Sequence, residues 1–419
     1  MSGLFSSLNG VSTALAAFSQ ALGAEQANVS NSSTPGYAAE RAVIQPIGFG
    51  FSSGAGFDRV SVQSTGNQLA DAIVRASESQ AAASDTEAAQ LGLLNQQFDI
   101  TGTAGIPAAL NGFSSAFADV SVTPNDSAVT ANAAAAVDRV AAAFRTAAQS
   151  VAGIRDNVTK NIDDVVTGIN GLAGQVAQLN GQIRNSAGGD AGKDTGADAG
   201  LDASRRTALE ALAADVGLTV TGNADGTLNV LVGGSIPLVL GDRAYAFSAS
   251  GADSSFSGTL GGLLEAKEAT GAALDDLNTL AAGFATAANA VSPLFTFDAA
   301  NPASSLQVNP GLTTASWSNG AANALAELAG QKDAANDQYA LLAESVGRKA
   351  ADATSRASTD QTSLTAAQAA QAQIEGVSLD VEAVNITAYQ RAWQASAKLI
   401  GVLDNLAVDA VNLVGQQDT

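Results

Sequence analysis

The 419-residue sequence contains no cysteine and no histidine. The lack of cysteine excludes disulfides and thiolate chemistry, and the lack of both residues excludes the usual zinc sites. It also excludes every catalytic arrangement in which a histidine activates a serine or a cysteine. Because histidine is the commonest general acid or base, we expect a protein that is not an enzyme, with no catalytic residue, cofactor or metal.

Basic residues and long apolar runs are also scarce. There are 19 Lys and Arg against 40 Asp and Glu, for a net charge of −21. Nucleic-acid phosphates and anionic membranes repel such a chain. No apolar run reaches the roughly 18–20 residues that a membrane span needs, and the first residues lack the basic segment of a secretory signal. We therefore expect neither nucleic-acid binding nor membrane insertion.

Small apolar residues are what the sequence has in abundance. Apolar residues make up 46% of it, alanine is frequent, and aromatic residues contribute only 5%. Small side chains suit closely packed helices better than a bulky sandwich core. At roughly 100–200 residues per domain, the length predicts two to four domains.

The strongest pattern lies at the two ends of the sequence. Apolar residues near the start are spaced alternately by four and three, at Leu4, Leu8, Val11, Leu15, Phe18 and Leu22. The same alternation near the other end includes Tyr389, Leu399, Leu403, Leu406 and Leu413, with a second seam beside it through Trp393. Such heptad seams are typical of helices that bury one stripe against another helix.

Neither terminal segment has a helical partner next to it in the sequence. The simplest arrangement pairs the two segments with each other and leaves their remaining apolar surface for other subunits, so we interpret these residues as an assembly interface. The alternative is an ordinary pair of core helices within one subunit.

A turn is expected directly after the first helix. Asn28 and Asn31 disfavour continued helix, and the turn itself consists of Thr34, Pro35, Gly36 and Tyr37. The proline presets φ at the second position of a type II turn, and the glycine supplies the positive φ of the third. Residues 41–56 then read as extended chain or loop, and a short strand is expected near Val60.

The middle of the sequence predicts a long helical rod. Helices are expected over 67–98, from Ile106 onward, and over 137–183, where apolar residues recur every three or four positions. Glycines interrupt this last stretch at Gly153, Gly168, Gly171, Gly174 and Gly181. Each glycine costs roughly 1 kcal/mol relative to alanine, and we expect close packing against neighbouring helices to offset that cost.

A small α+β module is expected to interrupt the rod. Residues 186–200 are rich in Gly and Asp and read as a flexible linker. The expected elements that follow are a helix over 201–214, a hairpin over 219–232 with its turn at Asp225-Gly226, and strands at 238–240 and 244–247. Helical spacing returns at 274–291, and further helices are expected from 320 and over 333–374.

The order of these elements predicts a mainly α fold with a small α+β insert, in which both ends of the sequence build the same layers of an elongated, nested molecule. Three domains are expected. They are a terminal coiled-coil assembly domain (1–40 and 375–419), a helical rod domain (41–190 and 262–374) and a small outer α+β domain (200–260).

Candidate chemical motifs are weak. Residues 188–194 lack the glycine and hydroxyl positions of a phosphate-binding loop. Asp190, Asp194, Asp198 and Asp202 recur at every fourth position. A calcium loop instead needs carboxylates at alternate positions, so a solvated linker is the preferred interpretation. The acidic pairs at 163–164 and 275–276 are interpreted as helix-surface charge and not as a hydrolase dyad.

The two terminal segments resemble a known family. Residues 28–37 are similar to the N-x-x-N-x-x-T-P-G-Y signature of the flagellar rod, hook and hook-associated axial proteins. The matching positions are Asn28, Asn31, Thr34, Pro35, Gly36 and Tyr37. Residues 376–385 and 389–398 resemble the C-terminal signature of the same family, although Val381 and Trp393 replace residues that are commoner there. Weaker similarity extends over most of the chain.

The resemblance implies a structural adaptor of the bacterial flagellum, a ring of self-assembling subunits that joins hook to filament. It implies type III export to the extracellular hook–filament junction and a role in motility. The implied partners are further copies of the chain, the hook protein, hook-associated protein 3 and an export chaperone at the C-terminal helix, 377–414. The alternatives are a flagellar hook or rod subunit, or a secreted enzyme with flagellar-type termini.

Overall fold

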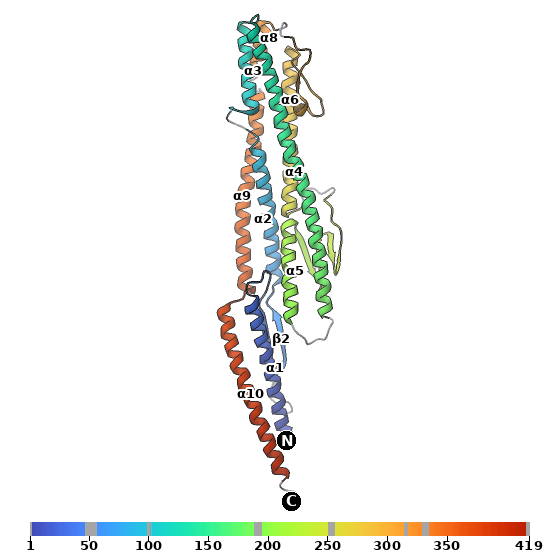
Figure 1. The fold of residues 1–419 in the computed structure, drawn as a ribbon, viewed down its shortest axis with the longest axis vertical. Helices are drawn as coiled ribbons and strands as arrows, with labels where there is room; N and C mark the ends of the chain where they lie inside the picture. The colour runs from blue at the N-terminus through green and yellow to red at the C-terminus, as the bar shows by residue number, and fades with distance from the viewer. Residues whose placement is uncertain are drawn as a thin grey trace.

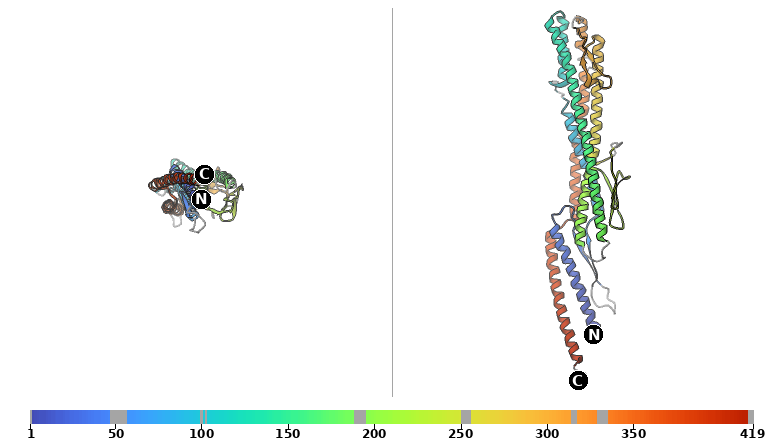
Figure 2. Two further views of the ribbon diagram at one scale, coloured as in Figure 1. Left: turned by 90° about the horizontal axis from the view of Figure 1, so that it is seen from below. Right: turned by 45° about the vertical axis from the view of Figure 1, so that its right-hand side comes forward.

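The helices stack into an elongated molecule whose two chain termini lie at the same end (Figure 1 and Figure 2). This computed structural model describes residues 2–46, 57–98, 101, 103–187, 195–249, 256–313, 317–328 and 335–415. Side chains are described over the same ranges except 2–6, 44–46, 57–60, 187, 195–198 and 410–415.

Helices make up most of the described chain. They are α1 Ser2–Asn31, α2 Gln68–Asn95, α3 Gly105–Val122, α4 Ser127–Ala187, α5 Thr195–Asp215, α6 Gly258–Val291, α7 Pro302–Ser305, α8 Asn319–Glu327, α9 Ala335–Glu375 and α10 Leu379–Gly415. Local sequence signals explain several boundaries. The Asn67 side chain caps α2 by accepting from the N–H groups of Leu69 and Ala70, and Pro107 lies in the first turn of α3.

Within the described residues, the strands form three small antiparallel sheets. They are β1 Glu40–Pro46 with β2 Phe57–Ser64, then β3 Leu218–Gly222, β4 Leu228–Val232, β5 Ile236–Leu240 and β6 Arg243–Ala244 in that spatial order, and β7 Phe295–Thr296 with β8 Gln307–Val308. Gly226 has φ +81 in the turn between β3 and β4, where the Asp-Gly pair predicts a hairpin. The predicted fold class, mainly α with a small β-containing insert, is confirmed.

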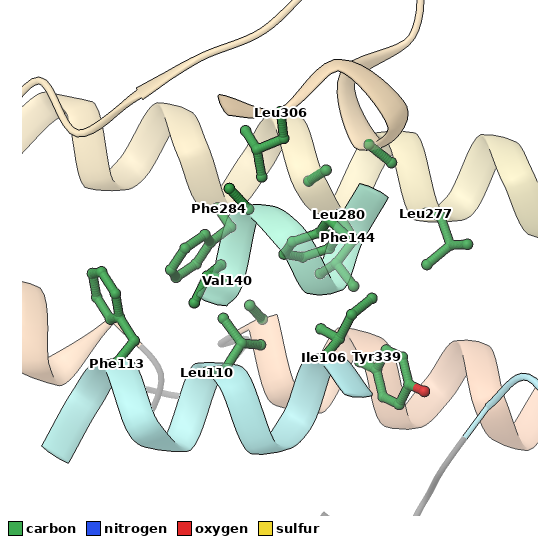
Figure 3. Close-up of a cluster of buried hydrophobic side chains, with 14 of the residues drawn as sticks. Ile106, Leu110, Phe113, Val140, Phe144, Leu277, Leu280, Phe284, Leu306 and Tyr339 are labelled. Atoms are coloured by element: carbon green, nitrogen blue, oxygen red, sulfur yellow. The ribbon is translucent and has the colours of Figure 1, made fainter. Parts of the chain in front are cut away.

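One large buried cluster lies where α3, α4, α6 and α9 meet (Figure 3). The ring centroids of Phe113 and Phe144 lie 5.4 and 6.5 Å from that of Phe284. Tyr339 of α9 is buried in the same cluster. The long α4 supplies much of this core because the apolar seam predicted over 137–183 faces its neighbours along most of its length.

A second buried cluster joins the other half of α4 to α5, to the four-stranded sheet and to the start of α6. Ile169, Leu212, Leu238 and Leu260 are fully buried in it. Ile154 is partly buried and packs against both clusters, so apolar contact is continuous along α4. The division into three domains remains a prediction, and the insert lies along the rod helix α4 in Figure 1.

Three predicted boundaries in and next to the insert are wrong. α6 begins at Gly258 and not near Leu274, because buried side chains such as Leu260 outweigh the low helix propensity of the local glycines. α5 begins at Thr195, so the second part of the predicted 186–200 linker is helical; residues 188–194 lie outside the described residues. Starting a helix is costly, whereas extending one that is already stabilised by packing is not. α5 can therefore extend over residues 195–200 although they are weak helix formers.

The third wrong boundary is that of the last strand, predicted over 244–247. β6 ends at Ala244, and the Tyr245 N–H still donates to the Leu238 carbonyl of β5 at 2.8 Å. Beyond Tyr245, an α4 side chain bonds the backbone of Phe247. Asn170 Nδ2 donates to the Phe247 carbonyl at 3.0 Å, and the Phe247 N–H donates to Asn170 Oδ1 at 2.7 Å. The Asn170 amide thus provides the hydrogen bonds of the Phe247 N–H and carbonyl that a neighbouring strand would otherwise provide.

The glycines of α4 do not serve close helix packing, contrary to expectation. A Cβ placed on Gly153, Gly171 or Gly174 would meet no neighbouring atom within 4 Å, and one on Gly168 or Gly181 would make only ordinary contacts, at 3.5 and 3.7 Å, with the side chains of Asp215 and Asp242. The close approach is elsewhere: a Cβ on Gly262 of α6 would overlap the carbonyl oxygen of Ala83 on α2. Glycine therefore permits the contact between α2 and α6, while the α4 glycines are tolerated because the rest of that helix is well packed.

Candidate assembly interface at the paired termini

The two terminal helices, α1 and α10, lie side by side beyond the end of the rod (Figure 1). The ring of Phe18 lies 6.5 Å from that of Tyr389, which fixes the contact between the two predicted seams. The buried apolar positions of α1 are alanines, Ala17, Ala21 and Ala24. The predicted seam residues Leu8, Val11, Leu15, Phe18 and Leu22 are only partly buried. Small side chains at the centre of the contact allow neighbouring elements to come close.

An apolar face of α10 is exposed to solvent in the single chain. Leu399 and Leu406 are 47% and 51% exposed, whereas Trp393, which is 40% exposed, lies on another side of the helix. Val402 is equally exposed and lies between Leu399 and Leu406 at helical spacing, so these three side chains share one face. The predicted interface did not include the exposed residues Val402, Val381 and Val384. Their helical spacing relative to Leu399 and Leu406 was the signal that could have identified them.

The remaining predicted interface residues divide into two groups. Leu403 and Tyr389 are half-buried in the single chain, so they are not part of the exposed face. Leu4 lies in α1 and Leu413 in α10, but both side chains are outside the described residues. The role of all these residues in contacts between subunits remains a prediction.

Asn28, the first residue of the family signature, lies at the centre of a buried polar cluster. Its Nδ2 donates to the Glu40 carbonyl at 2.8 Å and to Glu382 Oε2 at 3.2 Å. Its Oδ1 accepts from the Glu40 N–H at 2.7 Å and from the Tyr37 hydroxyl at 2.9 Å. Because the Asn28 side chain bonds outward to these groups, it does not end the helix, and α1 continues to Asn31, the second of the two asparagines that disfavour helix.

Two carboxyl groups meet in the same cluster. Glu25 of α1 and Glu382 of α10 are 4% and 6% exposed, and Asn385 Nδ2 lies 3.4 Å from both carboxylate oxygens of Glu25. Burial, followed by hydrogen bonding and repulsion from Glu382, raises the pKa of Glu25 to about 7. Burial and the nearby carboxylates of Glu40 and Glu382 also raise the pKa of Tyr37 to about 12, which keeps its hydroxyl a donor.

The turn after α1 packs against the insert. Gly36 has φ +73, and the Tyr37 N–H donates to the Thr34 carbonyl at 3.2 Å, as the predicted turn requires. A Cβ on Gly36 would lie 2.6 Å from the Ala203 carbonyl oxygen on α5. Thr207 Oγ1 of α5 donates to the Pro35 carbonyl at 3.3 Å. Glycine is therefore required at this position both for backbone conformation and for close approach.

The other signature residues of the turn are local. Thr34 donates from Oγ1 to Asn31 Oδ1 at 3.3 Å, and its N–H donates to the Asn31 carbonyl at 2.8 Å. Asn31 Nδ2 donates back to the Ala27 carbonyl at 2.9 Å, at the end of α1. These bonds shape the exit of the chain from the helix, and none of them reaches α10.

Glu375 connects the terminal pair to the rod and to the insert. It ends α9 and is buried; its carbonyl accepts from the Ala39 N–H at 2.8 Å, and its Oε1 accepts from the Asn67 N–H at 2.5 Å. Arg206 Nη1 of α5 donates to Glu375 Oε2 at 2.5 Å, and Arg206 Nη2 lies 3.4 Å from Asp71 Oδ2. Burial raises the pKa of Glu375 although Asn67 and Arg206 lower it. One residue, through its carbonyl and its side chain, thus joins α9 to the segment before β1, to the start of α2 and to α5.

The sequence predictions missed the charged residues of this region, Glu25, Glu375, Glu382 and Arg206. A signal was available for the first of them, since Glu25 lies three residues after Leu22 and so interrupts the seam of α1 with an acid.

The described residues contain no group of three or more His, Cys, Asp or Glu side chains that could hold a metal. Among the described helices, none is both long and apolar enough to cross a membrane.

Comparison with known proteins adds three similarities. A family model for the helical domain of the flagellar hook-associated protein FlgK matches residues 91–257. The chain is 24% identical to flagellar hook-associated protein 1 of Bacillus subtilis (strain 168) over 508 aligned positions, which cover 99% of each protein. That alignment is longer than the 419 residues of this chain, so the relative contains residues that this chain lacks.

The solved flagellar hook junction protein FlgK of Burkholderia pseudomallei is 25% identical, with a TM-score of 0.47. The match covers 55% of this chain and 45% of the solved chain, which is less than half of that protein.

Proposed function

We propose that the chain is a member of the flagellar hook-associated protein family and a structural adaptor that joins hook to filament as a ring of self-assembling subunits. The family is one of structural flagellar proteins. The match of the helical domain and the similarity over 99% of a hook-associated protein 1 both support this proposal. The predominance of helix favours the junction adaptor over a hook subunit, for which a β-rich chain is expected.

The observation that carries the proposal is the unpartnered apolar face of α10. Leu399, Val402 and Leu406 lie on one face of a helix whose other side already packs on α1. Burial of such a face on a neighbouring subunit would yield roughly 25 cal/mol for each Å² removed from water. Since both termini lie at one end of the elongated molecule (Figure 2), copies that pack through this end would project their rods and inserts outward.

The same proposal defines the location and the partners. We propose an extracellular position at the hook–filament junction, reached by type III export, with contacts to further copies of the chain, to the hook protein and to hook-associated protein 3. An export chaperone is proposed to bind the C-terminal helix over 377–414. The exposed side chains of α10 support this, because an apolar face that is buried only on assembly needs cover beforehand.

The test is complementation of a strain that lacks this chain, with electron microscopy of the cells and an assay of flagellin in the medium. We expect hooks without filaments in the deletion strain, and no rescue by Leu399→Asp or Leu406→Asp. Gln390→Asp, which adds the same charge at an exposed polar position of α10, is the matched control and should restore filaments.

Two outcomes would contradict the proposal. A deletion strain without hooks would move the assignment to a hook or rod subunit, and a strain with normal flagella would reject a flagellar role.

Thermal unfolding of the purified variants distinguishes a loss of subunit contacts from a loss of folding. Because both leucines are about half exposed, their variants should melt close to the parent, whereas a large loss of stability would assign them to the folded subunit.

A further inference from the structure

Two like-charged side chains from opposite ends of the sequence face each other in the contact between α1 and α10. Glu25 and Glu382 are almost completely buried there. Side-chain amides donate to both carboxylates: Asn385 to Glu25 at 3.4 Å, and Asn28 to Glu382 at 3.2 Å. Neither carboxylate has an ion pair within 4 Å among the described residues.

Such a pair is stable only if it retains a proton. Two carboxylates that share one buried site repel each other when both are ionised, whereas a single shared proton converts the repulsion into a hydrogen bond. The amide donors on either side can bond a neutral or an ionised carboxyl, so they do not replace the missing positive charge. Protonation therefore decides whether this part of the helix contact is attractive.

We propose that Glu25 and Glu382 form a proton-dependent clasp, which closes α1 on α10 while one proton is shared between the two carboxyl groups and loosens when that proton is lost. This inference goes beyond the proposed function and does not depend on it, because it concerns the pairing of two helices within one chain. Its consequence for assembly is direct: the clasp controls whether the terminal helices are presented as one packed pair.

The surrounding charges do not cancel the repulsion. Glu25 is the only charged residue of α1. β1 contributes the buried Glu40 and the exposed Arg41, and the turn contributes Tyr37. Arg41 lowers the pKa of Glu25, but its effect is smaller than those of burial and of Glu382. On α10, burial together with Glu25 and Glu382 raises the pKa of Tyr389, so this hydroxyl stays neutral. The described side chains of β2, residues 61–64, do not titrate.

The direction of the pH effect follows from these groups. The pKa of Glu25 rises from 4.5 to about 7 on folding, so the unfolded helix loses its proton first as the pH increases. The clasp stabilises the helix pair fully below pH 4.5, and this stabilisation declines as the pH rises towards about 7. One proton changes the equilibrium constant for pairing by at most about tenfold per pH unit over that window.

The absence of cysteine makes a clean test possible. Ser19→Cys and Gln390→Cys add exposed labelling sites to α1 and α10 of the full-length chain, which has no other cysteine to react. The distance between two spin labels at these sites is measured by pulsed electron paramagnetic resonance in samples frozen between pH 5 and 8.5. We expect one short distance at the acidic end and a reversible increase in a longer population as the pH rises through about 7.

The variants decide the cause of this change. Glu25→Gln mimics the protonated acid and should keep the short distance at every pH, and Glu382→Gln should do the same from the other helix. Asp404→Asn, which removes an exposed carboxylate from α10, is the matched control and should retain the response of the parent. The circular dichroism of each variant confirms that the helices themselves persist.

Three results would overturn the clasp. The first is a parent chain whose distance does not change between pH 5 and 8.5. The second is an unchanged pH response in both glutamine variants, which would assign the titration to another group. The third is loss of the short distance at every pH in both glutamine variants, which would show that the ionised carboxylates hold the helices together.

Discussion

Asn28 donates a hydrogen bond of 3.2 Å from its Nδ2 to Glu382 Oε2, a residue 354 positions away in the sequence. This bond joins the two terminal signature segments directly. The same side chain also accepts from the Tyr37 hydroxyl and from the Glu40 N–H. A residue whose type disfavours helix is therefore the point at which α1, the turn, β1 and α10 meet.

Asn28→Ala should destabilise this region substantially. The substitution leaves the buried N–H and carbonyl of Glu40 without their side-chain partner, and each such loss costs about 1–3 kcal/mol. We expect hydrogen exchange of residues 37–46 to accelerate by at least about tenfold, since about 1.4 kcal/mol corresponds to a factor of ten. Asn31→Ala, which removes only local bonds, is the control, and an equal effect in both variants would contradict the central role of Asn28.

Gly36→Ala should separate the turn from the insert. The added Cβ would overlap the Ala203 carbonyl oxygen, and φ +73 is strained for alanine, so we expect a loss of about 2 kcal/mol. Chemical unfolding of the purified chain measures this loss. Ser33→Ala changes an exposed residue beside the turn and should have no measurable effect. Unchanged stability of Gly36→Ala would mean that the turn does not pack on α5.

Glu375→Ala should weaken the joint between the terminal pair and the rod. Arg206 and the Asn67 N–H lose a buried acceptor, and removal of one partner from a buried ion pair costs about 3–5 kcal/mol. Differential scanning calorimetry should record a clear fall in the melting temperature. The comparison is Glu344→Ala, which breaks an exposed pair with Arg348 and should cost less than about 1 kcal/mol. Equal melting temperatures for the two variants would show that Glu375 does not hold the joint.

Two glycine-to-alanine substitutions should act in opposite directions. Gly171→Ala adds a methyl group to an exposed, uncrowded position of α4 and should stabilise the chain by up to about 1 kcal/mol. Gly262→Ala forces a Cβ against the Ala83 carbonyl on α2 and should destabilise it by about 1–3 kcal/mol. Thermal unfolding of both variants beside the parent gives the signs, and two shifts of the same sign would contradict the difference in packing between α4 and α6.

Local chemistry in the sequence determined the helical architecture and much of the insert. The heptad spacing of Leu8 to Leu22, the apolar periodicity of α4 and the Asp-Gly turn before β4 each specify an element through contacts close in sequence. The absence of cysteine and histidine also limits the chemistry of the protein, because folding cannot supply a thiol or an imidazole that the sequence lacks. These features are readable because period and turn geometry are properties of short segments.

The tertiary structure alone decided which side chains meet. Nothing in the spacing of α1 predicts that Glu25 faces Glu382, that Glu375 accepts from Arg206, or that Gly36 packs on α5. Asn170 bonds the backbone of Phe247 from a distant helix, and buried contacts begin α6 before its helical signal is readable. These outcomes depend on groups far apart in sequence, whose contact energies arise only after the chain has folded, and so no local pattern carries them.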